Sequence, residues 1–154
     1  MLQESSVIVQ DREAVIKMIE ADAAKDLPVV LSDQHLFLDL SHYGGDLRPR
    51  LIYLSDPEAS MRHLGHNSLE RGMIDLLKPW FHLNVQPYGP YIASQSAFLL
   101  CGDPQHFLNW VLDDLVSSGA QLELRARQKA VVLFLVRPGR GPNQSSNDSA
   151  LGRR

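Results

Sequence analysis

The chain has 154 residues, of which 44% are hydrophobic and 21% charged, with a formal net charge of −3. This composition is ordinary for a soluble globular protein, and the length favours one domain. The longest apolar run, residues 130–136, is far shorter than the ~20 residues that cross a bilayer. No secretory signal is visible at the N-terminus, and the single cysteine, Cys101, excludes an internal disulfide, so the sequence predicts a cytoplasmic protein.

The first third of the chain predicts one helix among short strands. A strand is expected at residues 7–10, and Asp11 is a good N-cap for an amphipathic helix. That helix should end before Pro28, because the residue before a proline is driven out of the helical region. Short apolar runs then predict strands at residues 29–31, 36–40 and 51–54.

The remaining elements follow the same logic. Asp56 and Pro57 start a broken helix that extends to Lys78. Asp103 and Pro104 start a second helix, which ends at Gly119. Strands are predicted at residues 81–85, 91–100, 122–127 and 131–136, and the last of these should be central in the sheet.

These elements predict an α+β fold, with an antiparallel sheet and helices packed on one face. The patterns at residues 7–38 and 97–134 read alike, which indicates a possible β-α-β-β repeat. Residues 1–137 are expected to form a single domain. Residues 138–154 are expected to form a disordered basic tail, because Gly, Pro, Ser and Asn dominate them.

Aromatic residues give the strongest indication of a binding surface. Most of them should be core residues, but Tyr88 and Tyr91 flank a Pro-Gly-Pro turn, and Trp110 lies off the main apolar stripe of its helix. A second apolar face often marks a partner surface. We therefore predict Trp110, Tyr88 and Tyr91 as candidate partner-binding residues, with core packing as the alternative.

The order of elements from Asp11 to Val116 resembles that of the small dimeric chaperones of type III secretion effectors. The segments that carry the resemblance are Lys78-Pro79-Trp80-Phe81, Gly89-Pro90-Tyr91 and Ser96-Ala97-Phe98-Leu99-Leu100. The resemblance implies a nonenzymatic homodimer that binds an extended stretch of another protein along apolar patches. It covers about two-thirds of the chain and rests on element order alone. The strands after Gly119 and the basic end depart from it, so no functional residue is transferred.

Three other chemistries remain open. Residues 120–154 hold 7 of the 15 basic residues and 2 of the 18 acidic ones, so a nucleic-acid-associated regulator would use Arg125, Arg127, Lys129, Arg137 and Arg140. A metal-dependent enzyme would use His63, His66 and His82. A thiol-dependent enzyme would use Cys101 and His106.

Each of these residue sets also has a purely structural interpretation. The basic residues would lie on a solvated hairpin, the histidines would lie at a polar helix break, and Cys101 would be a small buried apolar residue. We therefore predict a nonenzymatic, chaperone- or adaptor-like module. It should need no cofactor, bind another protein rather than a membrane, and act as a homodimer.

Overall fold

The computed structural model describes residues 2–67, 71–106 and 109–139. Its helices are α1 (Leu2–Ala21), α2 (Gln34–Tyr43), α3 (Pro57–Leu64), α5 (Lys78–Phe81), α6 (Tyr88–Ser94) and α7 (Trp110–Ser117), with a 3₁₀ helix η1 (Gly45–Arg50) and a π-helical segment η2 (Gly72–Leu77). Its strands are β1 (Val29–Leu31), β2 (Leu51–Ser55), β3 (Val85–Pro87), β4 (Phe98–Gly102), β5 (Gln121–Gln128) and β6 (Val131–Arg137). The predicted tail lies outside the described residues from residue 140 onward.

The described strands form one six-stranded sheet in the order β3-β2-β1-β4-β6-β5. Strands β1 to β4 run parallel to one another, and β6 runs antiparallel between β4 and β5. At the centre, Val30 pairs with Ile52 on one side and with Leu100 on the other. The α+β class is confirmed. The prediction of an antiparallel sheet is wrong for the four parallel strands and holds only along the β4-β6-β5 edge.

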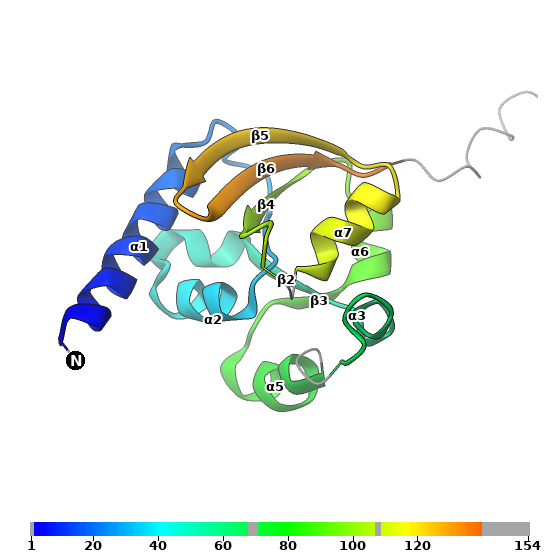
Figure 1. The fold of residues 1–154 in the computed structure, drawn as a ribbon, viewed down its shortest axis with the longest axis horizontal. Coiled ribbons are helices and arrows are strands. Elements are labelled where there is room, and N and C mark those ends of the chain that lie inside the picture. Colours follow the sequence, from blue (N-terminus) through cyan, green and yellow to red (C-terminus); the bar gives the residue numbers. More distant parts are fainter. Residues whose placement is uncertain (1, 68–70, 107–108, 140–154) are drawn as a thin grey trace, which may run out of the picture.

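Helices cover both faces of this sheet, so the prediction of helices on one face is also wrong. Figure 1 shows α1 and α2 on one side of the sheet and α3, α6 and α7 on the other. Strands β1, β2 and β4 are buried at every position, which is typical of parallel strands covered on both faces. Parallel strands need crossover connections, and here the crossover segments carry α2, α3 and α6, whereas α1 precedes β1 and α7 follows β4.

Each face of the sheet has its own hydrophobic cluster. The face toward α1 and α2 buries a set that includes Val15, Ile19, Phe37, Leu40, Val29, Leu31, Leu99 and Cys101. The face toward α3, α6 and α7 buries a set that includes Ala59, Tyr88, Tyr91, Trp110, Leu115, Val30, Leu54 and Phe98. Alternate residues of each central strand therefore enter opposite clusters, as strand geometry requires.

Residues 36–40 form part of helix α2 rather than the predicted strand. The Asp33 carboxylate accepts a hydrogen bond from the Leu36 backbone N–H at 3.0 Å and caps the helix. Phe37 and Leu40, one helical turn apart, are both buried. Residues 7–10 likewise lie inside α1, and Asp11 is not its cap. The possible β-α-β-β repeat is therefore not found, because its first copy lacks two of its strands.

The segment from residue 81 to residue 119 differs from its prediction at three points. Residues 81–84 precede β3 rather than belong to it, and residues 88–94 form helix α6 before β4 begins at Phe98. Helix α7 begins at Trp110, where the Asn109 side chain accepts a hydrogen bond from the Leu112 N–H at 3.3 Å. Asp103 instead accepts from the Gln105 N–H at 2.9 Å, within a turn.

The C-terminal hairpin agrees with the sequence. The strands predicted at residues 122–127 and 131–136 are β5 and β6, and β6 lies inside the sheet between β4 and β5. Across the parts of the chain that the structure describes, no helix combines the length and apolar character that crossing a membrane demands.

A close backbone approach at the carboxyl ends of β1 and β4 gives a stability prediction. A Cβ atom added to Gly102 would lie 1.9 Å from Ser32 Oγ and 3.3 Å from Ser32 Cβ. Gly102→Ala should therefore lower the free energy of unfolding by about 1–3 kcal/mol, the usual cost of overpacking. Urea denaturation followed by circular dichroism measures it.

The double variant Ser32→Ala/Gly102→Ala provides the control. Removing the Ser32 hydroxyl takes away the closest clashing atom, so the double variant should recover part of the lost stability. Ser32→Ala alone should cost little, because Ser32 Oγ has no hydrogen-bond partner among the described residues. A double variant as unstable as Gly102→Ala would contradict this explanation.

Candidate functional site

The residues predicted to bind a partner, Trp110, Tyr88 and Tyr91, lie in the core, which was the alternative that the sequence left open. Trp110 is 2% exposed, and Tyr88 and Tyr91 are also buried. The Tyr88 and Trp110 rings pack edge to face with their centroids 5.0 Å apart, and Tyr91 packs in the same way on Phe98. The apolar side of α7 that seemed unused in the sequence faces α6, because the parallel sheet has helices on this face as well.

A polar chain joins three of the helices on that face. The Tyr88 hydroxyl donates to Asp114 Oδ2 at 2.7 Å, and His63 Nε2 lies 3.1 Å from Asp114 Oδ1. Burial, followed by the neighbouring Asp114 carboxylate, raises the pKa of Tyr88 well above its ordinary value, so the phenol stays protonated. These two contacts of Asp114 link α7 to α6 and to α3. His63 therefore has a structural role in holding α3 against α7.

The histidines predicted as metal ligands are not brought together. His63 pairs with Asp114 on α7, whereas His82 follows α5. His66 is exposed beyond the end of α3. Within residues 2–67, 71–106 and 109–139, no group of three or more His, Cys, Asp or Glu side chains has an arrangement that would hold a metal ion.

Most of the basic side chains predicted to bind nucleic acid are paired with acids. Arg125 donates to Asp22 at 3.0 Å and to Glu123 at 3.0 Å, and the hydrogen bond to Asp22 lowers the pKa of that carboxyl. Lys129 pairs with Asp11 at 2.5 Å, and Arg137 lies 3.7 Å from Glu123. The two remaining residues are not paired in this way: Arg127 is exposed, and Arg140 lies outside the described residues.

The single cysteine is in the wrong state for nucleophilic chemistry. Cys101 is fully buried in the cluster that faces α1 and α2. Burial raises the pKa of its thiol to about 12, so almost no reactive thiolate exists near neutral pH. His106 belongs to the segment after β4, where its backbone N–H donates to the Asp103 carbonyl.

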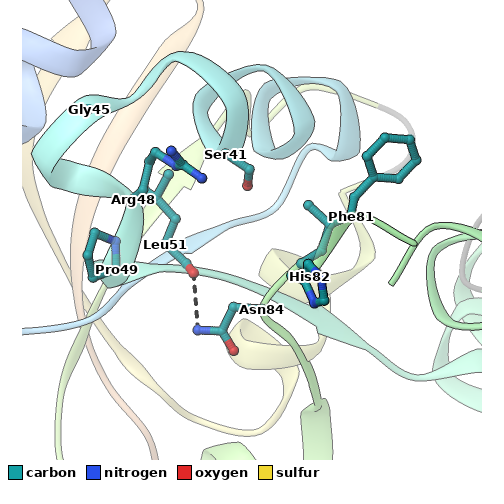
Figure 2. Close-up of a pocket in the computed structure, with 9 residues that line it drawn as sticks. Ser41, Gly45, Arg48, Pro49, Leu51, Phe81, His82 and Asn84 are labelled. Atoms are coloured by element: carbon teal, nitrogen blue, oxygen red, sulfur yellow. Dashed lines mark hydrogen bonds between the residues drawn. The ribbon is translucent and has the colours of Figure 1, made fainter. Parts of the chain in front are cut away.

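A pocket of about 410 Å³ opens at the amino ends of β2 and β3, and we call it the amino-edge pocket. Its described lining comprises Ser41, Gly45, Arg48, Pro49, Leu51, Phe81, His82, Leu83 and Asn84. In Figure 2, Arg48 comes from one side and Phe81 and His82 from the other. The Asn84 amide donates to the Leu51 carbonyl at 3.3 Å and joins the two strand starts at the base.

The electrostatics of this pocket are one-sided. None of its described lining residues is acidic, and Arg48 is exposed without an ion pair to any described residue. His82 adds an imidazole ring with a nitrogen that can donate a hydrogen bond. Ser41 and Asn84 add neutral polar groups. The lining is therefore suited to a negatively charged group.

Two adjacent aromatic side chains on α5 are exposed, and sequence reasoning did not single them out; one of them, Phe81, lines the amino-edge pocket. Trp80 is 79% exposed and Phe81 is 65% exposed, both on α5. The helix ends at His82, which adopts the left-handed conformation with φ 50° and ψ 40°. The sequence carried no clear signal of this exposure, because consecutive apolar residues of a helix can both be buried, as Trp110 and Val111 are.

Comparison of the chain with protein-family models, curated proteins and solved structures finds no match. The resemblance to type III secretion chaperones depends on an order of helix, three strands, helix, two strands, helix. The observed order has α2 in place of one of those strands and α6 before β4.

Proposed function

We propose that the protein is a nonenzymatic binding module that contacts another protein through Trp80 and Phe81. The observation that carries this proposal is the exposure of two adjacent large aromatic side chains, of which Phe81 also lines the amino-edge pocket. Burying a large apolar side chain contributes roughly 1.5–3 kcal/mol, and tryptophan is enriched among the residues that dominate binding energy. Burial of the exposed Trp80 and Phe81 side chains against a partner would therefore contribute a large part of the free energy of binding.

The amino-edge pocket indicates the chemistry of that partner. Its positive Arg48, the imidazole of His82 and the lack of acids in its described lining favour a carboxylate. A guanidinium binds a carboxylate through two parallel hydrogen bonds. The partner segment we propose presents an apolar side chain to Trp80 and Phe81, with an Asp, a Glu or a C-terminal carboxylate beside it.

The nonenzymatic part of the proposal is supported by Cys101, whose buried, protonated thiol is unsuited to attack a substrate. The homodimer predicted from the sequence stays a prediction. Sedimentation velocity over a range of concentrations tests it, and a second copy of the chain on the aromatic pair would make Trp80→Ala monomeric.

Selection from a displayed peptide library tests the proposed contact. Peptides that combine an aromatic or aliphatic residue with an acidic one should be enriched on the wild-type protein. Trp80→Ala/Phe81→Ala should weaken binding of those peptides more than about tenfold, equivalent to 1.4 kcal/mol. Arg48→Gln should remove the preference for an acidic residue.

Leu124→Ala is the matched control, because Leu124 is also a large exposed apolar residue but lies on β5, far along the sheet order. It should leave peptide affinity unchanged. Enriched peptides that bind the double variant as tightly as the wild type would overturn the proposal, as would a selection that enriches no peptides.

A further inference from the structure

A second pocket, of about 690 Å³, lies at the carboxyl ends of strands β2 and β3, opposite the amino ends where the amino-edge pocket lies. Its described lining comprises Ser55, Asp56, Pro57, Glu58, Met61, Arg62, Asn67, Arg71, Pro87, Tyr88, Gly89 and Pro90. Ser55 and Pro87 are the last residues of the parallel strands β2 and β3, and we call this the carboxyl-edge pocket. Ligands of open α/β sheets bind outside the carboxyl ends of the strands, and this volume suits a small molecule.

Two guanidinium groups in the lining have no acidic partner among the described residues. Arg62 and Arg71 are both exposed, and neither makes an ion pair with a described residue. By contrast, Arg12 pairs with Asp39 and Arg125 with Asp22. Guanidinium groups bind phosphate and carboxylate oxygens in a planar, bidentate manner. The two unpaired arginines therefore provide recognition for an oxyanion.

Ser55 supplies an independent sign of a ligand. The residue is only 4% exposed, it lines the pocket, and its Oγ atom has no hydrogen-bond partner among the described residues. Leaving a buried hydroxyl without a partner costs about 1–3 kcal/mol. A bound ligand with a hydroxyl group would supply the missing hydrogen bond.

The acidic residues of the lining narrow the ligand class. One oxygen of Asp56 accepts hydrogen bonds from the Glu58 and Ala59 backbone N–H groups at 2.9 Å each, which caps α3. The other Asp56 oxygen and the exposed Glu58 remain to accept hydrogen bonds from ligand hydroxyl groups. These carboxylates would repel a bare multivalent anion, so the charged group should be one part of a molecule that also carries hydroxyls.

We propose that the carboxyl-edge pocket binds a small hydroxylated organic anion, with its oxyanion on Arg62 and Arg71 and a hydroxyl on Ser55. This proposal does not depend on Trp80 and Phe81, because the two pockets lie at opposite ends of strands β2 and β3. The shared chemistry is an oxyanion beside a hydroxyl group, and a phosphate or a carboxylate can supply the oxyanion.

NMR titration of the full chain tests the proposal with four probes: glycerol 3-phosphate, glycerate, inorganic phosphate and glycerol. At least one of the two hydroxylated anions should shift the backbone amides of Ser55, Asp56 and Tyr88 in a saturable way, and the stronger of the two identifies the oxyanion. Inorganic phosphate should bind more weakly and glycerol should not saturate. Equal binding of inorganic phosphate, or shifts elsewhere only, would overturn the proposal.

Three variants assign the contacts. Arg62→Gln/Arg71→Gln should weaken binding of the hydroxylated anion about tenfold or more, whereas Arg127→Gln, an exposed arginine on β5, should not change it. Ser55→Ala loses no partner in the fold and should weaken the hydroxylated anion but not inorganic phosphate. Wild-type affinity in the double arginine variant, confirmed as folded by its amide spectrum, would overturn the assignment.

Discussion

Trp110→Ala is expected to lower the free energy of unfolding by about 3–5 kcal/mol, the usual loss when a fully buried tryptophan is truncated. Trp110 is 2% exposed and packs edge to face on Tyr88 in the cluster between the sheet and helices α3, α6 and α7. The alanine variant would leave a large cavity at the start of α7. Urea denaturation followed by circular dichroism measures the change.

Trp80→Ala is the matched control, because the chain has two tryptophans and the other one is 79% exposed. Its unfolding free energy should stay close to that of the wild type. A Trp110→Ala variant that keeps wild-type stability would show that Trp110 is a surface residue, as the sequence suggested. Equal losses in both variants would contradict the opposite roles assigned to the two side chains.

Raising the pH above about 9 is expected to destabilise the fold by several kcal/mol. Burial raises the pKa of Cys101 from 9.0 to about 12 and that of Tyr91 from 10.0 to about 12, and burial and Asp114 raise that of Tyr88. At a pH between the ordinary pKa and the raised pKa of each group, the unfolded chain has lost a proton that the folded chain keeps. Stability is therefore fully present below pH 9 and falls by about 1.4 kcal/mol per pH unit for each such group.

The Cys101→Ala variant isolates one of these contributions. Between pH 9 and pH 10 only the thiol, of these three groups, has an ordinary pKa low enough to ionise in the unfolded chain. The free energy of unfolding of Cys101→Ala should therefore fall less steeply between pH 9 and pH 10 than that of the wild type. Urea denaturation at several pH values measures this slope. A slope in Cys101→Ala equal to that of the wild type would contradict the burial of a neutral thiol.

The sequence predicted the C-terminal hairpin well but not the helices that cover the parallel strands. Residues 36–40 alternate as a strand would, yet Phe37 and Leu40 also satisfy a helical spacing, and the cap at Asp33 decides between them. Asp103 and Pro104 form a strong helix-start signal, but Asn109 caps α7 six residues later. Local patterns of this kind fit two structures, and tertiary packing selects one.

Strand direction was beyond a reading of local pattern. The continuous apolar run of β2, Leu51–Ser55, indicates a strand buried on both faces, but it does not say which strand lies beside it. The pairing of β1 with β4 depends on contacts such as Val29 with Leu99, which no local spacing encodes. The misplacement of Trp110 follows directly, because helices on a single face would have left one side of α7 in water.

The two candidate pockets could not be predicted from the sequence, because segments that are distant in the sequence form each pocket at one end of strands β2 and β3. Arg48 and His82 line the same pocket only because β2 and β3 start side by side. The exposure of Trp80 and Phe81 was also not predicted, because their helix has only four residues and shows no helical periodicity.

The pairing of the innermost strand has a consequence during synthesis on the ribosome. Strand β1 emerges early, but its partner on one side, β4, is translated only after two further strands and several helices. Until then, the hydrogen-bonding groups along that side of β1 lack their native neighbour, and a nascent chain in this state is open to mispairing with other chains. Loop-closure entropy further delays so distant a contact, so the β1–β4 pairing in the middle of the sheet can form only after synthesis has passed Gly102.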